Sequence, residues 1–148
     1  MIERRGLRWL VVVPLAAWAA IAAVPAAYAD PTGAQSELSA VSGQGTGKVI
    51  VSPTSAPEAN FVAQVKVIIN NAAPHTTFTV TRAAEGPADG VCTSTAFAPV
   101  ATLTTSAGGA GAVEFKRTGP GLNFDLFLRV TGTDGSVLES GCMVIIGK

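Results

Sequence analysis

The chain has 148 residues, 48% of them hydrophobic, with ten acidic and ten basic side chains. This length suits one domain with a modest core. A nucleic-acid-binding role is disfavoured, because phosphate neutralisation needs clustered lysine or arginine and the only adjacent pair after residue 30 is Lys116-Arg117.

The first 29 residues have the pattern of a secretory signal peptide. Residues 4–8 carry three arginines, residues 9–24 are largely apolar, and small residues lead up to Ala29. We expect Sec-type export with cleavage after Ala29, because the arginine pair lacks the wider context of twin-arginine export. A membrane anchor is the alternative, but Pro14 makes the apolar run a poor permanent span.

Residues 30–47 are rich in glycine, serine and other small residues, and they are expected to form a flexible leader. Residues 48–148 are then the folded domain. After cleavage, seven basic and nine acidic residues give a net charge of −2.

From residue 48 onward, short runs of β-branched residues alternate with glycine, proline, asparagine and aspartate, which is typical of many short strands. No segment shows sustained helical periodicity. We predict seven strands, over residues 48–52, 61–70, 76–82, 100–106, 112–118, 124–130 and 137–147.

Alternation assigns a core face to three of these strands. In the strand over residues 61–70, Gln64, Lys66 and Asn70 lie on the opposite side from the apolar residues. The residues predicted to point inward are Phe61, Ala63, Val65, Val67 and Ile69, then Phe78 and Val80, and finally Phe124, Leu126, Leu128 and Val130.

Turn chemistry connects the later strands. The adjacent glycines Gly108-Gly109 within residues 107–111 predict a tight hairpin, and Asp134-Gly135 predicts a turn before the last strand. The fold class we predict is all-β, a two-sheet antiparallel sandwich of about seven strands, immunoglobulin-like, with one disulfide.

The disulfide is predicted between Cys92 and Cys142, the only cysteines in the chain. An oxidising exterior permits the bond, and two cysteines allow one intramolecular connectivity. A buried free pair and an intermolecular bridge are the alternatives. Redox catalysis is disfavoured because it usually needs a close pair such as C-x-x-C. The bond is expected to tie the long connection around Cys92 to the terminal strand.

Catalytic and metal-binding signatures are sparse. His75 is the only histidine and lies in a predicted turn, where it has no second histidine or spare cysteine as a zinc partner. Asp89, Asp125 and Asp134 are candidate calcium ligands, although Asp89 and Asp134 precede glycine and are explained as turn formers. We therefore predict no metal and no cofactor.

Glycoside hydrolysis requires a pair of carboxylates, which sequence alone does not place in space. The two tryptophans and the single tyrosine all lie within residues 1–29, so the exported chain has neither residue for a sugar-binding platform. We expect a protein that is not an enzyme. The candidate carboxylates are Glu85, Asp89, Glu114, Asp125 and Glu139.

One predicted binding surface consists of outward-facing threonines. Thr77, Thr79 and Thr81, beside Thr102 and Thr104, are expected to make a flat, hydroxyl-lined sheet face. The alternative is that threonine simply suits a half-exposed strand.

The second predicted surface is Phe127 with Arg129. Phe127 is opposite in phase to Phe124, Leu126 and Leu128, so its ring is either exposed, where it would anchor a partner, or covered by a loop such as residues 117–123.

The exported chain resembles the small secreted proteins of high-GC Gram-positive bacteria, which are rich in alanine, threonine and glycine. Its stretches VIVSP and TTSAGGAGAVEF are similar to the secreted apoproteins that carry enediyne chromophores, which are seven-stranded immunoglobulin-like sandwiches. Those apoproteins have two short-range disulfides that this chain lacks. Their ligand pocket is therefore assigned to no residue here.

The expected function is a secreted, non-catalytic binding or envelope-associated module. Its partner would be an extracellular protein or a cell-envelope component, with no nucleic acid and no stable membrane span. The alternative is a carrier of a small apolar ligand in a crevice between the sheets, and the third is a secreted hydrolase. A carrier predicts a deep apolar pocket, whereas a surface module predicts a filled core.

Overall fold

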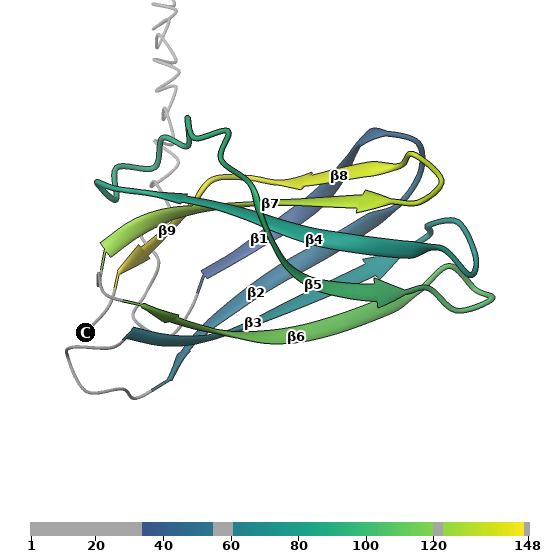
Figure 1. Ribbon diagram of the computed structural model, residues 1–148, viewed down its shortest axis with the longest axis horizontal. Coiled ribbons are helices and arrows are strands. Elements are labelled where there is room, and N and C mark those ends of the chain that lie inside the picture. The colour runs from purple at the N-terminus through teal and green to yellow at the C-terminus, as the bar shows by residue number, and fades with distance from the viewer. Residues whose placement is uncertain (1–33, 55–60, 120–122, 147–148) are drawn as a thin grey trace, which may run out of the picture.

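The computed structural model describes residues 34–54, 61–119 and 123–146 (Figure 1). The regular elements within these ranges are all strands. They are β1 (Ala34–Ser42), β2 (Thr46–Thr54), β3 (Phe61–Asn70), β4 (Thr77–Glu85), β5 (Ala98–Thr104), β6 (Gly111–Gly119), β7 (Asn123–Gly132), β8 (Val137–Ser140) and β9 (Met143–Ile146). The signal peptide predicted over residues 1–29 lies outside the described residues.

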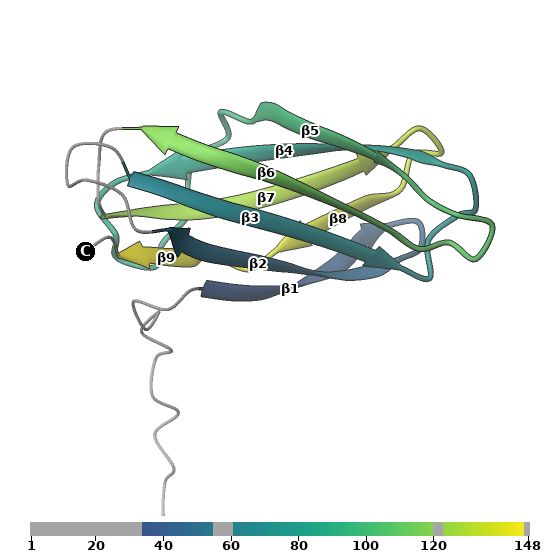
Figure 2. The ribbon, with the colours of Figure 1, turned by 90° about the horizontal axis from the view of Figure 1, so that it is seen from below.

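The strands form one continuous antiparallel sheet in the order β5-β4-β7-β8-β1-β2-β3-β6, with β9 also pairing with β7. The sheet curls into a nearly closed barrel, so that its edge strands β5 and β6 lie next to each other (Figure 2). The all-β, antiparallel, single-disulfide prediction is confirmed. Two separate sheets are not seen, because β1 pairs with both β2 and β8 and carries the hydrogen bonding round the barrel.

The flexible leader predicted over residues 30–47 is wrong for its described part, because residues 34–42 form β1. Ala34 and Leu38 of this strand are buried in the core, while most of the residues between and after them are small or polar and exposed. Two inward positions four residues apart are enough to seat the strand. The folded domain therefore begins at least as early as Ala34.

The terminal strand predicted over residues 137–147 is broken into β8 and β9 at Gly141 and Cys142. Ser140 occupies the break: its Oγ accepts the Leu128 N–H at 3.0 Å and donates to the Gly141 carbonyl at 2.8 Å. The Gly141 N–H donates in turn to Ser36 Oγ of β1 at 2.8 Å. Side-chain bonds thus replace the ladder where the strand bends.

The core fills the inside of the barrel, and alternation predicted its main contributors correctly. The predicted inward residues of β3, β4 and β7 are buried, apart from Phe61, whose side chain lies outside the described residues. The largest fully buried side chains are Leu38, Val49, Val51, Val65, Val67, Ile69, Phe78, Val80, Leu126, Leu128, Val130 and Leu138.

The turn predicted over residues 107–111 is present, but the β-hairpin is not. The Ser106 N–H donates to the Ala110 carbonyl at 2.8 Å, and Gly109 has φ +74°, where a Cβ would clash with the Ala72 carbonyl. β5 pairs only with β4, and β6 only with β3. The turn therefore carries the chain across the barrel's seam, and β5 and β6 diverge away from it (Figure 1).

Candidate functional site

The Cys92–Cys142 disulfide is confirmed, with the two Cα atoms 5.6 Å apart. Cys92 lies in the connection between β4 and β5, and Cys142 lies at the break between β8 and β9. The bond joins a long loop to the C-terminal strand, as the sequence predicts. Its role is structural.

The three candidate calcium ligands are not assembled into a metal site, and no cluster of metal-ligating side chains occurs within the described ranges. Asp125 is fully buried and accepts the N–H groups of Asp89 and Gly90, each at 3.1 Å. Asp134 lies in the turn after β7, where hydrogen bonds from the Ser136 hydroxyl and N–H lower the pKa of its carboxyl. Both aspartates serve local structure.

His75 is exposed in the turn before β4. It has φ +50°, and its N–H donates to the Ser106 carbonyl at 3.3 Å. This contact links the 71–76 turn to the turn at the seam.

The carboxylates considered for hydrolysis are each engaged elsewhere. Glu114 pairs with Lys66 at 3.1 Å, and Glu139 pairs with Arg129 at 2.7 Å. Glu85 accepts the Ser94 N–H at 3.0 Å, together with the N–H and hydroxyl of Thr93. Glu85 therefore holds the loop around the disulfide.

Protonation of Glu85 is expected to loosen this loop. The Ser94 N–H, and then the Thr93 groups, lower the pKa of Glu85 below its ordinary value of 4.5. Its contribution to stability is therefore present above pH 4.5 and is lost as the pH falls through the lowered pKa. Amide protection factors of Thr93 and Ser94 should fall on acidification in the native protein. In Glu85→Gln they should be low already at neutral pH, with the 105–110 turn as internal reference; the same acid response in both proteins would contradict this role.

The predicted threonine surface is assembled on the outside of β5, β4 and β7. Thr77 pairs with Thr104, with their hydroxyls 3.1 Å apart, and Thr79 lies between Thr102 and Thr131 of the two flanking strands. The hydroxyl of Thr81, in contrast, donates to the backbone of β7. Part of the hydroxyl array is thus satisfied within the sheet.

The predicted surface at Phe127 is covered. Phe127 is half-buried and packs on Phe97 at a centroid distance of 5.7 Å, and the guanidinium of Arg129 lies 4.2 Å from the same Phe97 ring. The covering ring of Phe97 comes from the 86–97 connection. Residues 120–122 of the loop named as an alternative cover lie outside the described residues. Phe127 and Arg129 hold that loop against β7.

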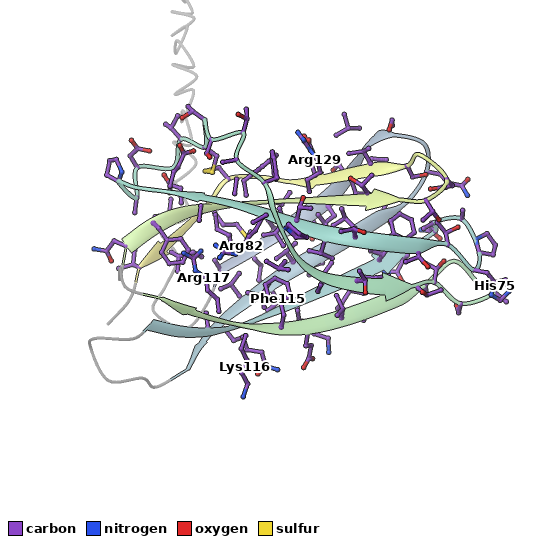
Figure 3. All side chains as sticks on the ribbon, viewed as in Figure 1. His75, Arg82, Phe115, Lys116, Arg117 and Arg129 are labelled. Carbon is purple, nitrogen blue, oxygen red and sulfur yellow. A yellow bond between two sulfur atoms is a disulfide. The ribbon has the colours of Figure 1, made fainter. Side chains whose placement is uncertain are left out.

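Sequence reasoning missed the cleft at the seam between β5 and β6. Its volume is about 250 Å³. Figure 3 shows Arg82 of β4 and Arg117 of β6 between the two sides of the barrel, with Phe115 beside them. The lining residues are Arg82, Val100, Phe115, Lys116 and Arg117.

Both arginines occupy inward positions of their strands. Arg82 continues the buried row of Phe78 and Val80, and Arg117 follows Phe115, which packs against the core. At such positions a strand normally places an apolar residue. Lys116 has the opposite phase, is exposed, and points away from the interior at the outer rim (Figure 3).

The Arg117 guanidinium is partly buried against an aromatic ring. It lies 3.9 Å from the centre of the Phe124 ring, and its Nη1 atom is buried with no hydrogen-bond partner in the described structure. Burial, and then the positive charge of Arg82, lower the pKa of Arg117 to about 10. Among the described residues, neither arginine forms an ion pair with an acidic side chain. The cleft therefore combines two arginines, neither with an acidic partner among the described residues, with the partly apolar surfaces of Val100 and Phe115.

Comparisons with protein-family models, with curated proteins and with solved structures find no match for this chain. Within the part of the chain that the structure describes, no helix is long and apolar enough to cross a membrane.

Proposed function

We propose that this protein is a secreted, non-catalytic binding module that holds a small anionic ligand in the cleft between β5 and β6. The observation that carries the proposal is the buried Nη1 of Arg117, which has no partner in the described structure, beside Arg82, which has no acidic partner among the described residues. A buried donor without an acceptor costs about 1–3 kcal/mol. A bound anion in the cleft would supply the missing counter-charge for the two arginines.

The unliganded fold gains nothing evident from this charge. The lowered pKa means that the unfolded chain holds the Arg117 proton more tightly, so the charge costs stability at neutral pH and the cost begins to fall only above about pH 10. An apolar residue at the same inward position would be cheaper. Residues that are locally unfavourable for the fold are characteristic of functional sites.

Other features support the remaining parts of the proposal. The disulfide fits export to an oxidising compartment. The structural roles of Glu85, Asp125 and Glu139 favour a binding protein over a secreted hydrolase. The curled antiparallel sheet is compatible with an immunoglobulin-like origin, and the threonine face leaves a surface for an extracellular protein or envelope component. The cationic lining makes the carrier alternative a carrier of anions rather than of purely apolar molecules.

Removing the Arg117 charge is expected to stabilise the empty protein and abolish anion binding. Arg117→Met keeps a flexible apolar side chain on Phe124. It should raise the free energy of unfolding by about 1 kcal/mol, because relief of the unsatisfied donor exceeds the lost cation–π contact. Thermal unfolding with and without acetate, at constant ionic strength, measures both effects.

The matched control is Lys48→Gln on the outer face of β2, which removes the same charge from an exposed position. It should keep the full acetate response of the native protein. An acetate response that survives unchanged in Arg117→Met would refute the proposed function.

A further inference from the structure

We infer that the ligand of the β5–β6 cleft is a carboxylate carried on a small apolar body, such as a short aliphatic acid or a single-ring aromatic acid. This inference rests on the proposed function and names its ligand class. It follows from the direction of the donors, the nature of the walls and the size of the cleft.

The donors favour a planar anion. The Arg117 guanidinium lies 3.9 Å from the centre of the Phe124 ring. The guanidinium donors form a planar fork, which matches a carboxylate in a two-bond pairing. A tetrahedral phosphate or sulfate is best held by donors from several directions. Lys116, the third cation at the cleft, points away from the interior (Figure 3).

Two of the five lining side chains, Val100 and Phe115, favour an apolar body. Val100 and Phe115 line the cleft and also pack against the hydrophobic core, so each presents part of its surface to the space beside the arginines. An inorganic anion would leave these surfaces in contact with water. An apolar group attached to the anion would cover them and gain the free energy of burial.

The volume limits the size of this body. Pockets for drug-sized ligands usually span about 300–1,000 Å³, and this cleft has about 250 Å³. At roughly 30 Å³ per heavy atom, the share that a water molecule takes in the liquid, the cleft accommodates about eight heavy atoms. Hexanoate has this size, and longer chains would extend past the seam into solvent.

The test is calorimetric titration of the purified protein with straight-chain carboxylates from acetate to decanoate, with inorganic phosphate, and with hexanol. Affinity should rise about fourfold for each added methylene group, and the rise should stop near hexanoate. Hexanol, which has the chain without the charge, should bind at least tenfold more weakly than hexanoate. Arg82→Gln should weaken the binding of all the carboxylates, whereas Phe115→Leu should chiefly reduce the gain in affinity per methylene group.

The outcomes separate this inference from the proposed function. Suppose that acetate and phosphate bind with equal affinity, that both depend on Arg117, and that longer chains bind no more tightly. The ligand-class inference is then wrong, and the anion site stands. Equal binding of hexanol and hexanoate also overturns the inference. If no anion binds in a manner that depends on Arg117, both ideas fail. Lys48→Gln should match the native protein throughout the series.

Discussion

Replacing Cys92 and Cys142 with serine is expected to lower the free energy of unfolding by about 4 kcal/mol. The bond joins positions 50 residues apart, and the chain entropy that it removes from the unfolded state grows with the length of the closed loop. Small domains have only about 5–15 kcal/mol of stability in total. The double variant should therefore unfold at a much lower denaturant concentration.

The loss should have a distinct structural pattern. β9 pairs only with β7, so without the disulfide it should exchange its amides much faster, together with the 86–97 connection. The β2–β3 ladder, on the far side of the barrel, should keep its protection as an internal control. Hydrogen exchange measures both regions. Uniform loss of protection over the barrel, or a stability change under 1 kcal/mol, would contradict the structural role given to the bond.

Removing the Asp125 carboxylate is expected to have the second-largest effect. Asp125 is fully buried, and its carboxylate is the acceptor for the N–H groups of Asp89 and Gly90. Charge-assisted hydrogen bonds of this kind contribute about 1.5–3 kcal/mol each, and the two donors would lose their acceptor together. Asp125→Ala should therefore lower the free energy of unfolding by about 3 kcal/mol.

Asp125→Asn refines this prediction because it keeps one acceptor oxygen and the same shape. It should cost about half as much as the alanine variant. Asp134→Ala is the matched control, since this aspartate also caps a turn but is exposed, and its loss should cost less than about 1 kcal/mol. Denaturant unfolding of the three variants gives the ranking. Equal losses for Asp125→Ala and Asp134→Ala would contradict the anchoring role of Asp125.

The strands and their inward faces could be predicted because each is recorded in a local pattern. Alternation over residues 61–70 and the row Phe78–Val80 identify a core face without knowledge of any partner strand. The disulfide followed from a count, since two cysteines in an exported chain leave one intramolecular pairing. These inferences depended on residues close together in the chain.

The errors arose where long-range pairing decides the structure. β1 was missed because its exposed positions are polar and small, and only its pairing with β2 and β8 makes Ala34 and Leu38 core residues. The 107–111 turn was identified correctly from its glycines, but a turn does not reveal whether its flanking strands pair with each other. Here they pair with β4 and β3, which leaves the seam open.

The sequence does carry a signal for the candidate site. Arg82 and Arg117 each follow inward apolar residues with the period of two, and an arginine in that phase needs either a counter-ion or a ligand. The sequence does not show that Arg82 and Arg117 come close together in space. The site depends on β4 and β6 facing each other across the seam, and on the described acidic residues being engaged elsewhere.

Isotope-edited NMR of the arginine Nε–H groups during a hexanoate titration would show whether Arg82 and Arg117 bind an anion inside the seam. Arg129 is an internal reference, because it lies on the outer face and is already paired with Glu139 at 2.7 Å. We expect saturable shifts of the Arg82 and Arg117 signals while the Arg129 signal stays fixed. Unchanged Arg82 and Arg117 signals, or a shift of Arg129 of equal size, would contradict this expectation.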